Sequence, residues 1–114
     1  MRRRWRHFAT TSGRKPVRDY IAALPLEDRA SVLAAMAEVR AIGLRGARHL
    51  RGDVYEVRAP SGRVSYRVLF ADEGAHGTVL LSLHAFAKQS RKTPAHEIDL
   101  ALARLADWRV RGRP

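Results

Sequence analysis

The chain contains no cysteine among its 114 residues. This absence excludes disulfide bonds, thiolate metal sites and cysteine-based catalysis together. The chain also lacks an apolar run of roughly 18 residues, so no segment is expected to span a bilayer. Its basic N-terminus is not followed by the apolar segment of a secretory signal peptide. These absences predict a cytoplasmic protein that has no membrane partner.

Acidic residues are scarce in this chain. The sequence has 11 Asp and Glu against 22 Lys and Arg, which gives a formal net charge of +11. Basic side chains that neutralise phosphates release condensed counterions, so this excess favours nucleic acid as the partner. Hydrophobic residues still make up 46% of the chain. That fraction and the length predict one globular domain over residues 1–114.

The first half of the chain predicts one strand and two helices. Apolar and basic residues alternate over residues 4–10, which indicates a strand. Apolar residues at helical spacing predict helices over residues 17–24 and 26–42, separated by Pro25 and ended by Gly43. Because the joint is so short, the two helices should form a hairpin on one face of a sheet.

The second half predicts three strands and a last helix. The strands cover residues 54–59, 63–70 and 78–86, and the helix covers residues 95–108. The predicted fold class is therefore α+β, an antiparallel sheet with element order β-α-α-β-β-β-α. The period of two along the first two of these strands should place four charged residues on one face: Glu56, Arg58, Arg63 and Arg67.

A basic loop with the sequence AKQSRKTPAHE follows the last predicted strand at residues 87–97. If the strands pair as predicted, the basic residues of the sheet converge on those of this loop. Such a convergence makes a phosphate-binding platform, although a solvated cationic face is the alternative. The converging residues are Arg58, Arg63, Arg67, Lys88, Arg91 and Lys92.

The sequence lacks the motifs of several common enzyme classes. The five histidines have no short metal-ligand spacing, so neither a metal site nor a cofactor is predicted. The sequence contains no P-loop, dinucleotide-binding motif or nucleophile elbow, which argues against kinases, dehydrogenases and serine hydrolases. His96, at the start of the last predicted helix, is the histidine that suits an acid or base.

Three segments together resemble a known family: RHLRGDVYEVRA, SYRVLF and LLSLHAFAKQSRKTPAHEIDLALARLADW. In order and spacing they are similar to the phage-derived HigB-like branch of the RelE/ParE toxin superfamily. The segment SGRKPVRDYIAALP resembles the family's first helix, so the likeness covers nearly the whole chain. The resemblance implies a RelE-like fold and a type II toxin whose partner is a cognate antitoxin, often a helix-turn-helix protein. Such toxins cleave mRNA, commonly on the ribosome.

The resemblance also implies a chemistry. In relatives the 2′-hydroxyl beside the scissile phosphate attacks, with no metal, so the protein must supply a base, an acid and cations. The family's basic strand residues correspond to Arg58 and to Arg63 or Arg67, and its loop lysines correspond to Lys88 and Lys92. Arginine stays protonated at neutral pH, so Arg58, Arg63 and Arg67 are expected to bind phosphate and stabilise transition-state charge.

Proton transfer is then left to Lys88, Lys92, His96 or Glu56, and the sequence does not choose among them. The candidate catalytic residues are Arg58, Arg63, Arg67, Lys88, Lys92 and His96. The candidate RNA-binding residues are Arg58, Arg63, Arg67, Lys88, Arg91 and Lys92.

Two other functions stay open at this point. A ParE-like toxin would share the fold but poison DNA gyrase, and it would need no RNA-cutting site. A non-catalytic nucleic-acid-binding module would have no toxicity at all. The loop's basic residues and its Lys-Thr-Pro sequence favour the ribonuclease.

Overall fold

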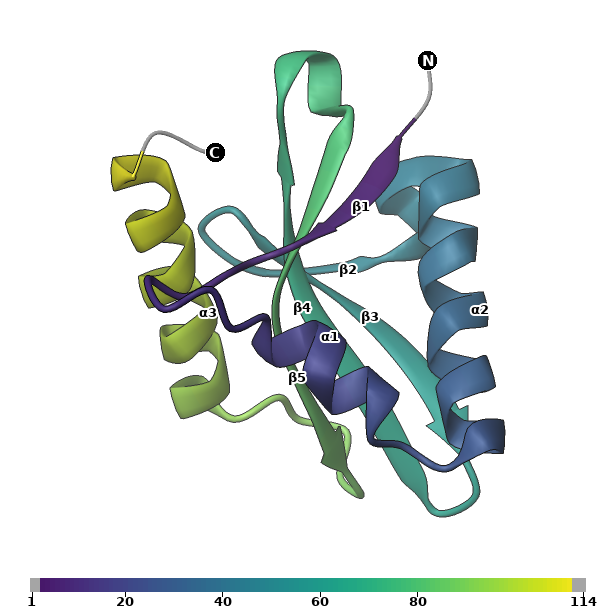
Figure 1. Cartoon of the computed structure of the whole chain (residues 1–114). Coiled ribbons are helices and arrows are strands. Elements are labelled where there is room, and N and C mark those ends of the chain that lie inside the picture. The colour runs from purple at the N-terminus through teal and green to yellow at the C-terminus, as the bar shows by residue number, and fades with distance from the viewer. Residues whose placement is uncertain (1–2, 112–114) are drawn as a thin grey trace.

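The computed structural model describes residues 3–111. It contains one five-stranded sheet with strand order β1-β5-β4-β3-β2 (Figure 1). The strands are β1 (Arg4–His7), β2 (Arg48–Arg51), β3 (Val54–Ser61), β4 (Val64–Glu73) and β5 (Val79–Lys88). The helices are α1 (Pro16–Ala22), α2 (Leu26–Ile42) and α3 (Ala95–Val110), with short 3-10 turns at Gly43–Gly46 and Ala75–Gly77.

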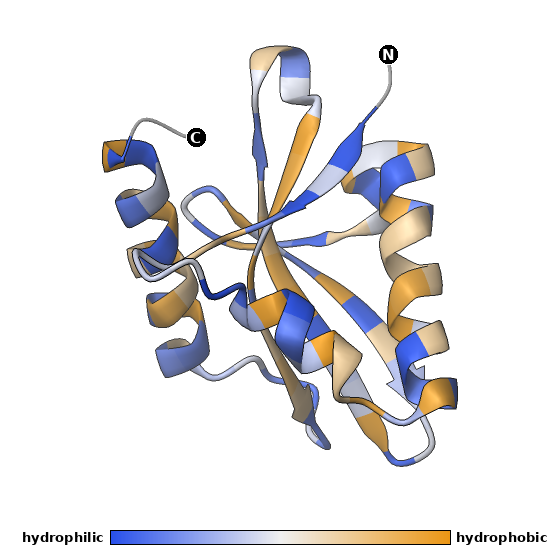
Figure 2. Ribbon diagram, viewed as in Figure 1, coloured by the Kyte–Doolittle hydropathy of each residue, from blue (hydrophilic) through white to orange (hydrophobic). Residues whose placement is uncertain are grey.

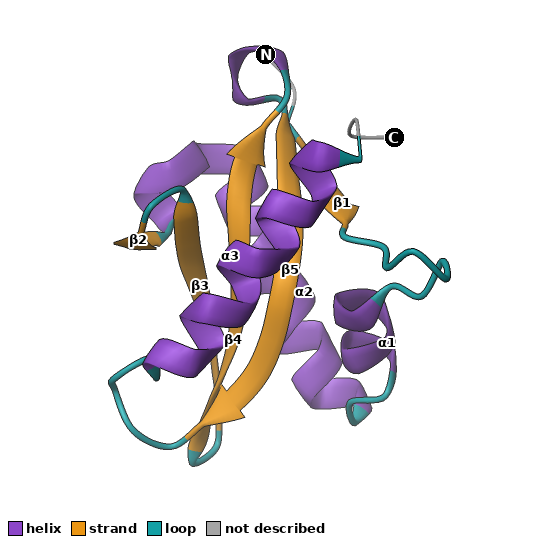
Figure 3. Ribbon diagram, turned by 90° about the vertical axis from the view of Figure 1, so that its left-hand side faces the viewer, coloured by secondary structure: helices purple, strands orange, loops and turns teal. Residues whose placement is uncertain are grey.

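The helices cover both faces of the sheet. Helices α1 and α2 lie on one face and α3 crosses the other (Figures 1 and 3). On the first face Val17, Ile21 and Met36 pack with Phe70 and Leu80. On the second face the contacting residues are Ala101, Leu105, Trp108, Leu69, Leu81 and Leu83. The α+β class and the shared face of the first two helices are therefore confirmed.

The prediction of a fully antiparallel sheet is wrong. The meander β3-β4-β5 is antiparallel as expected, but β1 runs parallel to β5, with Trp5 opposite Leu80. The sheet is therefore mixed. Alternation along a strand determines which face each side chain takes, but it carries no information on strand direction.

The predicted element order also lacks a strand. Residues Arg48–Arg51 form β2, which pairs antiparallel with β3 at the sheet edge. The strand has only four residues and is mostly polar, so it gives no clear period. The ring of His49 lies 5.1 Å from that of Tyr55, and Leu50 packs on the α3 side. Exposed arginines on a short edge strand also discourage pairing with other chains.

Local sequence explains the main helix boundaries. Helix α2 has Glu27 and Asp28 in its first turn, where carboxylates complement the helix dipole, and it ends at Gly43, whose φ is 81°. The Asp28 carboxylate also accepts hydrogen bonds from Ser61 Oγ at 2.5 Å and Tyr66 Oη at 2.6 Å. These bonds lower the pKa of Asp28 and connect α2 to the β3-β4 hairpin.

Hydrophobic residues run along much of β4 and β5, whereas the helices carry both hydrophobic and hydrophilic residues (Figure 2). Within residues 3–111, no helix combines the length and the apolar composition that a membrane span requires.

Candidate active site

The candidate site begins with two arginines that face each other across strands. Arg58 on β3 is directly opposite Arg67 on β4. Glu56 lies two residues before Arg58, so the strand period puts all three side chains on the face that α3 covers elsewhere. The prediction that Glu56, Arg58 and Arg67 share a face is confirmed.

Glu56 is the centre of a hydrogen-bond network. Its Oε1 accepts a bond of 2.6 Å from Arg58 Nε, and its Oε2 accepts one from the Thr93 hydroxyl. Arg67 Nη1 lies 4.0 Å from Oε2 and donates to Thr93 Oγ1 at 3.0 Å. Glu56 and Arg67 are each only 1% exposed. A buried charge is tolerated when it is paired and hydrogen-bonded in this way.

The same network holds the basic loop onto the sheet. Arg67 Nη2 donates to the carbonyl oxygen of Ser90, and Arg58 Nη2 donates to that of Arg91 at 2.6 Å. Together with the bonds of Thr93, these bonds attach the loop between β5 and α3 at three residues: Ser90, Arg91 and Thr93. The position of the loop therefore depends on residues that lie on two other strands.

The pKa of Arg67 is lowered, and burial is the largest cause. The nearby charges of Arg58 and Arg48 lower this pKa further, whereas the charge of Glu56 raises it. Arginine starts from so high a pKa that it stays protonated. In this arrangement a phosphate cannot reach the Arg67 guanidinium unless the loop moves, because the loop covers it.

The loop forms a pocket of about 330 Å³ beside this network. Its lining includes Lys88 from the end of β5 and Lys92 from the loop, with Ser90, Pro94 and Ala95. Lys88 is half-buried and Lys92 is exposed. The two lysines thus share one small space, although the sequence separates them by three residues. Arg58 keeps 28% of its side chain exposed next to the loop.

Two other candidate residues, Arg91 and Arg63, do not line this pocket. Arg91 is exposed in the loop. The prediction that a strand begins at Arg63 is wrong. Strand β4 begins at Val64, and Arg63 lies in the turn between β3 and β4. The turn needs Gly62 at a φ of 61°, so the chain reverses there and leaves Arg63 exposed at the tip of the hairpin.

His96 lies in the first turn of α3 and its side chain is 79% exposed. Its Nε2 is 3.4 Å from Glu97 Oε1, and Nε2 of His84 on β5 is 3.1 Å from the same oxygen. His84 also stacks on Phe86, with ring centres 5.4 Å apart. Two histidines therefore share one carboxylate next to the basic loop.

Sequence reasoning missed three participants: Arg48, Thr93 and Glu97. Thr93 is the middle residue of the Lys-Thr-Pro sequence, so a signal for it was present. Arg48 lies on the unpredicted strand β2 opposite Glu56, and it lowers the pKa of Arg67. Among the residues that the structure describes, no cluster of three or more His, Cys, Asp or Glu side chains could hold a metal ion.

Comparison with known proteins identifies the family of this chain. The model of the phage-derived Gp49-like protein family matches residues 19–106. The chain is also 32% identical over 108 residues to a protein named probable endoribonuclease HigB1 from Mycobacterium tuberculosis, and the same values hold for the CDC 1551 / Oshkosh and H37Rv strains. The alignment covers 92% of this chain and 84% of the relative.

These matches define a RelE-like toxin of the toxin–antitoxin class. Within that class, the chain belongs to the phage-derived Gp49-like family, the HigB-like branch that its motifs resemble.

Proposed function

We propose that this chain is a single-domain, metal-independent endoribonuclease toxin that cleaves mRNA. The observation that carries the proposal is the pocket in which Lys88 and Lys92 lie together, formed by a loop that Glu56, Arg67 and Thr93 fasten to the sheet. The likeness to a probable endoribonuclease supports ribonuclease activity. We expect the protein to act in the cytoplasm, on mRNA at the ribosome.

The proposed reaction needs only the RNA and protein side chains. The 2′-oxygen attacks the neighbouring phosphorus, the bond from phosphorus to the 5′-oxygen breaks, and the products carry a 2′,3′-cyclic phosphate and a 5′-hydroxyl. A base accepts the 2′-hydroxyl proton and an acid donates a proton to the leaving oxygen. Cations stabilise the negative charge that accumulates on the phosphorane.

Lys88 and Lys92 suit both phosphate binding and proton transfer, because they line the same pocket. Arg58 is the partly exposed arginine that we assign to transition-state charge. His96, whose Nε2 lies 3.4 Å from Glu97 Oε1, remains the alternative acid or base. Arg63 and Arg91 are exposed, so we assign them to contacts with RNA outside the scissile phosphate.

We assign Glu56 and Arg67 a positioning role. Both oxygens of Glu56 already accept hydrogen bonds, which leaves it poorly placed to accept a proton from substrate. Arg67 lies under the loop and is 1% exposed. Its contribution to the reaction is to hold Ser90 and Thr93, and through them the two lysines.

The proposed partner is a cognate antitoxin, with a helix-turn-helix protein as the expected kind. Without it, induction of the chain should stop growth and create new 5′ ends inside coding regions. The double variant Lys88→Ala/Lys92→Ala should lose both effects, whereas Arg45→Ala, which removes an exposed cation from the 3-10 turn after α2, should retain them.

The alternatives give different outcomes in the same experiment. Growth arrest with DNA damage and intact transcripts would identify a ParE-like gyrase poison. No arrest from the wild-type chain would favour a non-catalytic nucleic-acid-binding module.

A further inference from the structure

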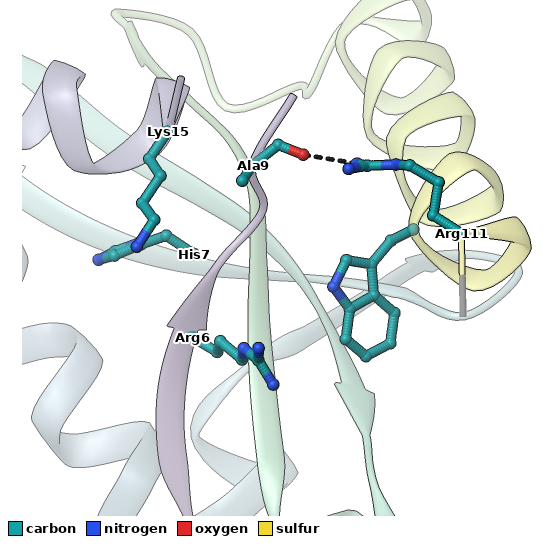
Figure 4. Close-up of a pocket in the computed structure, with 6 residues that line it drawn as sticks. Arg6, His7, Ala9, Lys15 and Arg111 are labelled. Atoms are coloured by element: carbon teal, nitrogen blue, oxygen red, sulfur yellow. Dashed lines mark hydrogen bonds between the residues drawn. The ribbon is translucent and has the colours of Figure 1, made fainter. Parts of the chain in front are cut away.

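A second cationic pocket lies at the sheet edge formed by β1 (Figure 4). Three short segments supply its walls: β1 with the residues after it, the approach to α1, and the C-terminal end of α3. Its volume is about 100 Å³, smaller than the 330 Å³ of the basic-loop pocket. The lining residues are Arg6, His7, Ala9, Lys15, Trp108 and Arg111.

Positive charge dominates this lining. Arg6, Lys15 and Arg111 carry cations, and none of the lining residues in the described part of the chain is acidic. Burial lowers the pKa of His7 most, and the charges of Lys15 and Arg18 lower it further. Like charges held near one another repel, so an anion in this space would be stabilised.

Arg111 is already fixed for such a role. Its Nη2 donates to the Ala9 carbonyl at 2.5 Å, and its guanidinium carbon lies 5.4 Å from the centre of the Phe8 ring. It also pairs with Asp107 at 3.1 Å. Its Nε is nevertheless buried without a hydrogen-bond partner within residues 3–111. A buried donor without a partner costs free energy. The Arg111 side chain keeps 25% of its surface exposed, so a ligand would meet its other atoms rather than the buried Nε.

His7 is fixed from the opposite side. Its Nδ1 lies 2.6 Å from Ser82 Oγ on β5, so Nε2 is the remaining polar atom of the ring. Figure 4 shows Lys15 beside His7 on one side of the pocket and Arg111 on the other. A small oxyanion between them would meet donors from two directions.

We propose that this pocket binds one phosphate group of an RNA strand whose scissile bond lies at the basic-loop pocket. The two pockets are at opposite ends of α3: Ala95 lines one, and Trp108 and Arg111 line the other. The 16 residues of α3 span roughly 24 Å, so the RNA must extend over several nucleotides. RNA as the source of the phosphate rests on the proposed function, but the phosphate site itself does not.

The test follows the ring signals of His7 by NMR in the intact wild-type chain. The probes are inorganic phosphate, a dinucleotide and a longer oligonucleotide, both with 2′-O-methyl groups so that neither can be cut. Phosphate and the longer oligonucleotide should shift the His7 signals and raise the His7 pKa, because a bound anion favours the protonated ring. The dinucleotide is too short to reach both pockets.

The matched variants are Lys15→Gln and Arg45→Gln, which remove the same charge from the pocket and from a distant turn. Lys15→Gln should weaken binding of the longer oligonucleotide several-fold. It should also lower the salt dependence of that binding by about one phosphate contact. It should weaken dinucleotide binding less, because a dinucleotide cannot occupy both pockets at once. Equal effects of the two variants would mean that only net charge matters, and would overturn the proposal.

Two further outcomes would also overturn it. If phosphate shifts His7 but the longer oligonucleotide does not, the site takes free phosphate and the assignment to RNA is wrong. If neither probe shifts His7, the pocket is not a phosphate site. A chain that binds both probes at His7 but never cleaves RNA would instead contradict the proposed function alone.

Discussion

The two faces of the sheet differ in how they are packed. The face under α1 and α2 is lined by apolar side chains along its length, among them Val57, Val68 and Phe70. The face under α3 is apolar where that helix lies on it, but next to the basic loop it carries Arg67 and Glu56 in a buried polar network. The face under α1 and α2 mainly stabilises the fold. The face under α3 stabilises the fold and also positions the basic loop.

The difference explains why the basic loop can be held in one place. An apolar surface would give the loop no directional contacts, whereas charged hydrogen bonds fix both distance and angle. The burial of Arg67 and the position of the loop depend on each other, since Thr93 and Ser90 are the partners of that guanidinium.

The largest effect on stability is expected from the apolar face. Phe70 is fully buried, with its ring 5.1 Å from that of Trp5. Phe70→Ala should therefore lower the free energy of unfolding by about 3–5 kcal/mol, measured by denaturant titration. The control Leu26→Ala changes a residue that is 75% exposed on α2, and it should alter stability by less than about 0.5 kcal/mol. Similar values for both variants would contradict the account of this face.

A smaller effect on stability, but a complete effect on cleavage, is expected from the polar network. Glu56→Ala should cost about 1–3 kcal/mol, because it leaves Arg67 buried without its carboxylate. Glu38→Ala, on the exposed side of α2, is the matched control. In the double variant Glu56→Ala/Arg67→Met, stability should return because both charges are gone.

Cleavage should not return in that double variant, because the loop has lost its attachment. Unfolding and RNA cleavage measured on the same preparations separate the two roles. Recovery of cleavage together with stability would show that the network serves the fold only.

The smallest effect concerns pH. Burial and two nearby cations hold the pKa of His7 below its usual value of about 6.5. As the pH falls below about 6.5, the unfolded chain binds a proton at this residue before the folded chain does, so stability decreases until the lower folded pKa is passed. His7→Gln should remove this part of the decrease in denaturant titrations at different pH. An identical pH dependence in both chains would contradict it.

Much of the fold follows from local patterns in the sequence. The predicted helix over residues 26–42 has the same bounds as α2, because its ends carry local signals: acids in the first turn and Gly43 at the end. The parallel pairing of β1 and the existence of β2 depend on partners far along the chain. No periodicity within a strand reveals such a partner.

The site residues, too, divide into those that local patterns predict and those that depend on distant parts of the chain. Strand alternation was enough to place Arg58 and Arg67 on one face. It could not reveal that Arg67 is buried under the loop, because burial depends on where residues 89–94 lie. The Lys-Thr-Pro sequence marked the loop, but the role of Thr93 as the link to Glu56 is visible only in three dimensions.

The most direct test of the central claim is the chemistry of the RNA ends that the induced chain produces. Attack by the 2′-hydroxyl predicts 5′-hydroxyl ends at the new cleavage sites, present with the wild-type chain and absent with Lys88→Ala/Lys92→Ala. New ends that carry a 5′-phosphate, or 5′-hydroxyl ends that persist in the double variant, would contradict the account.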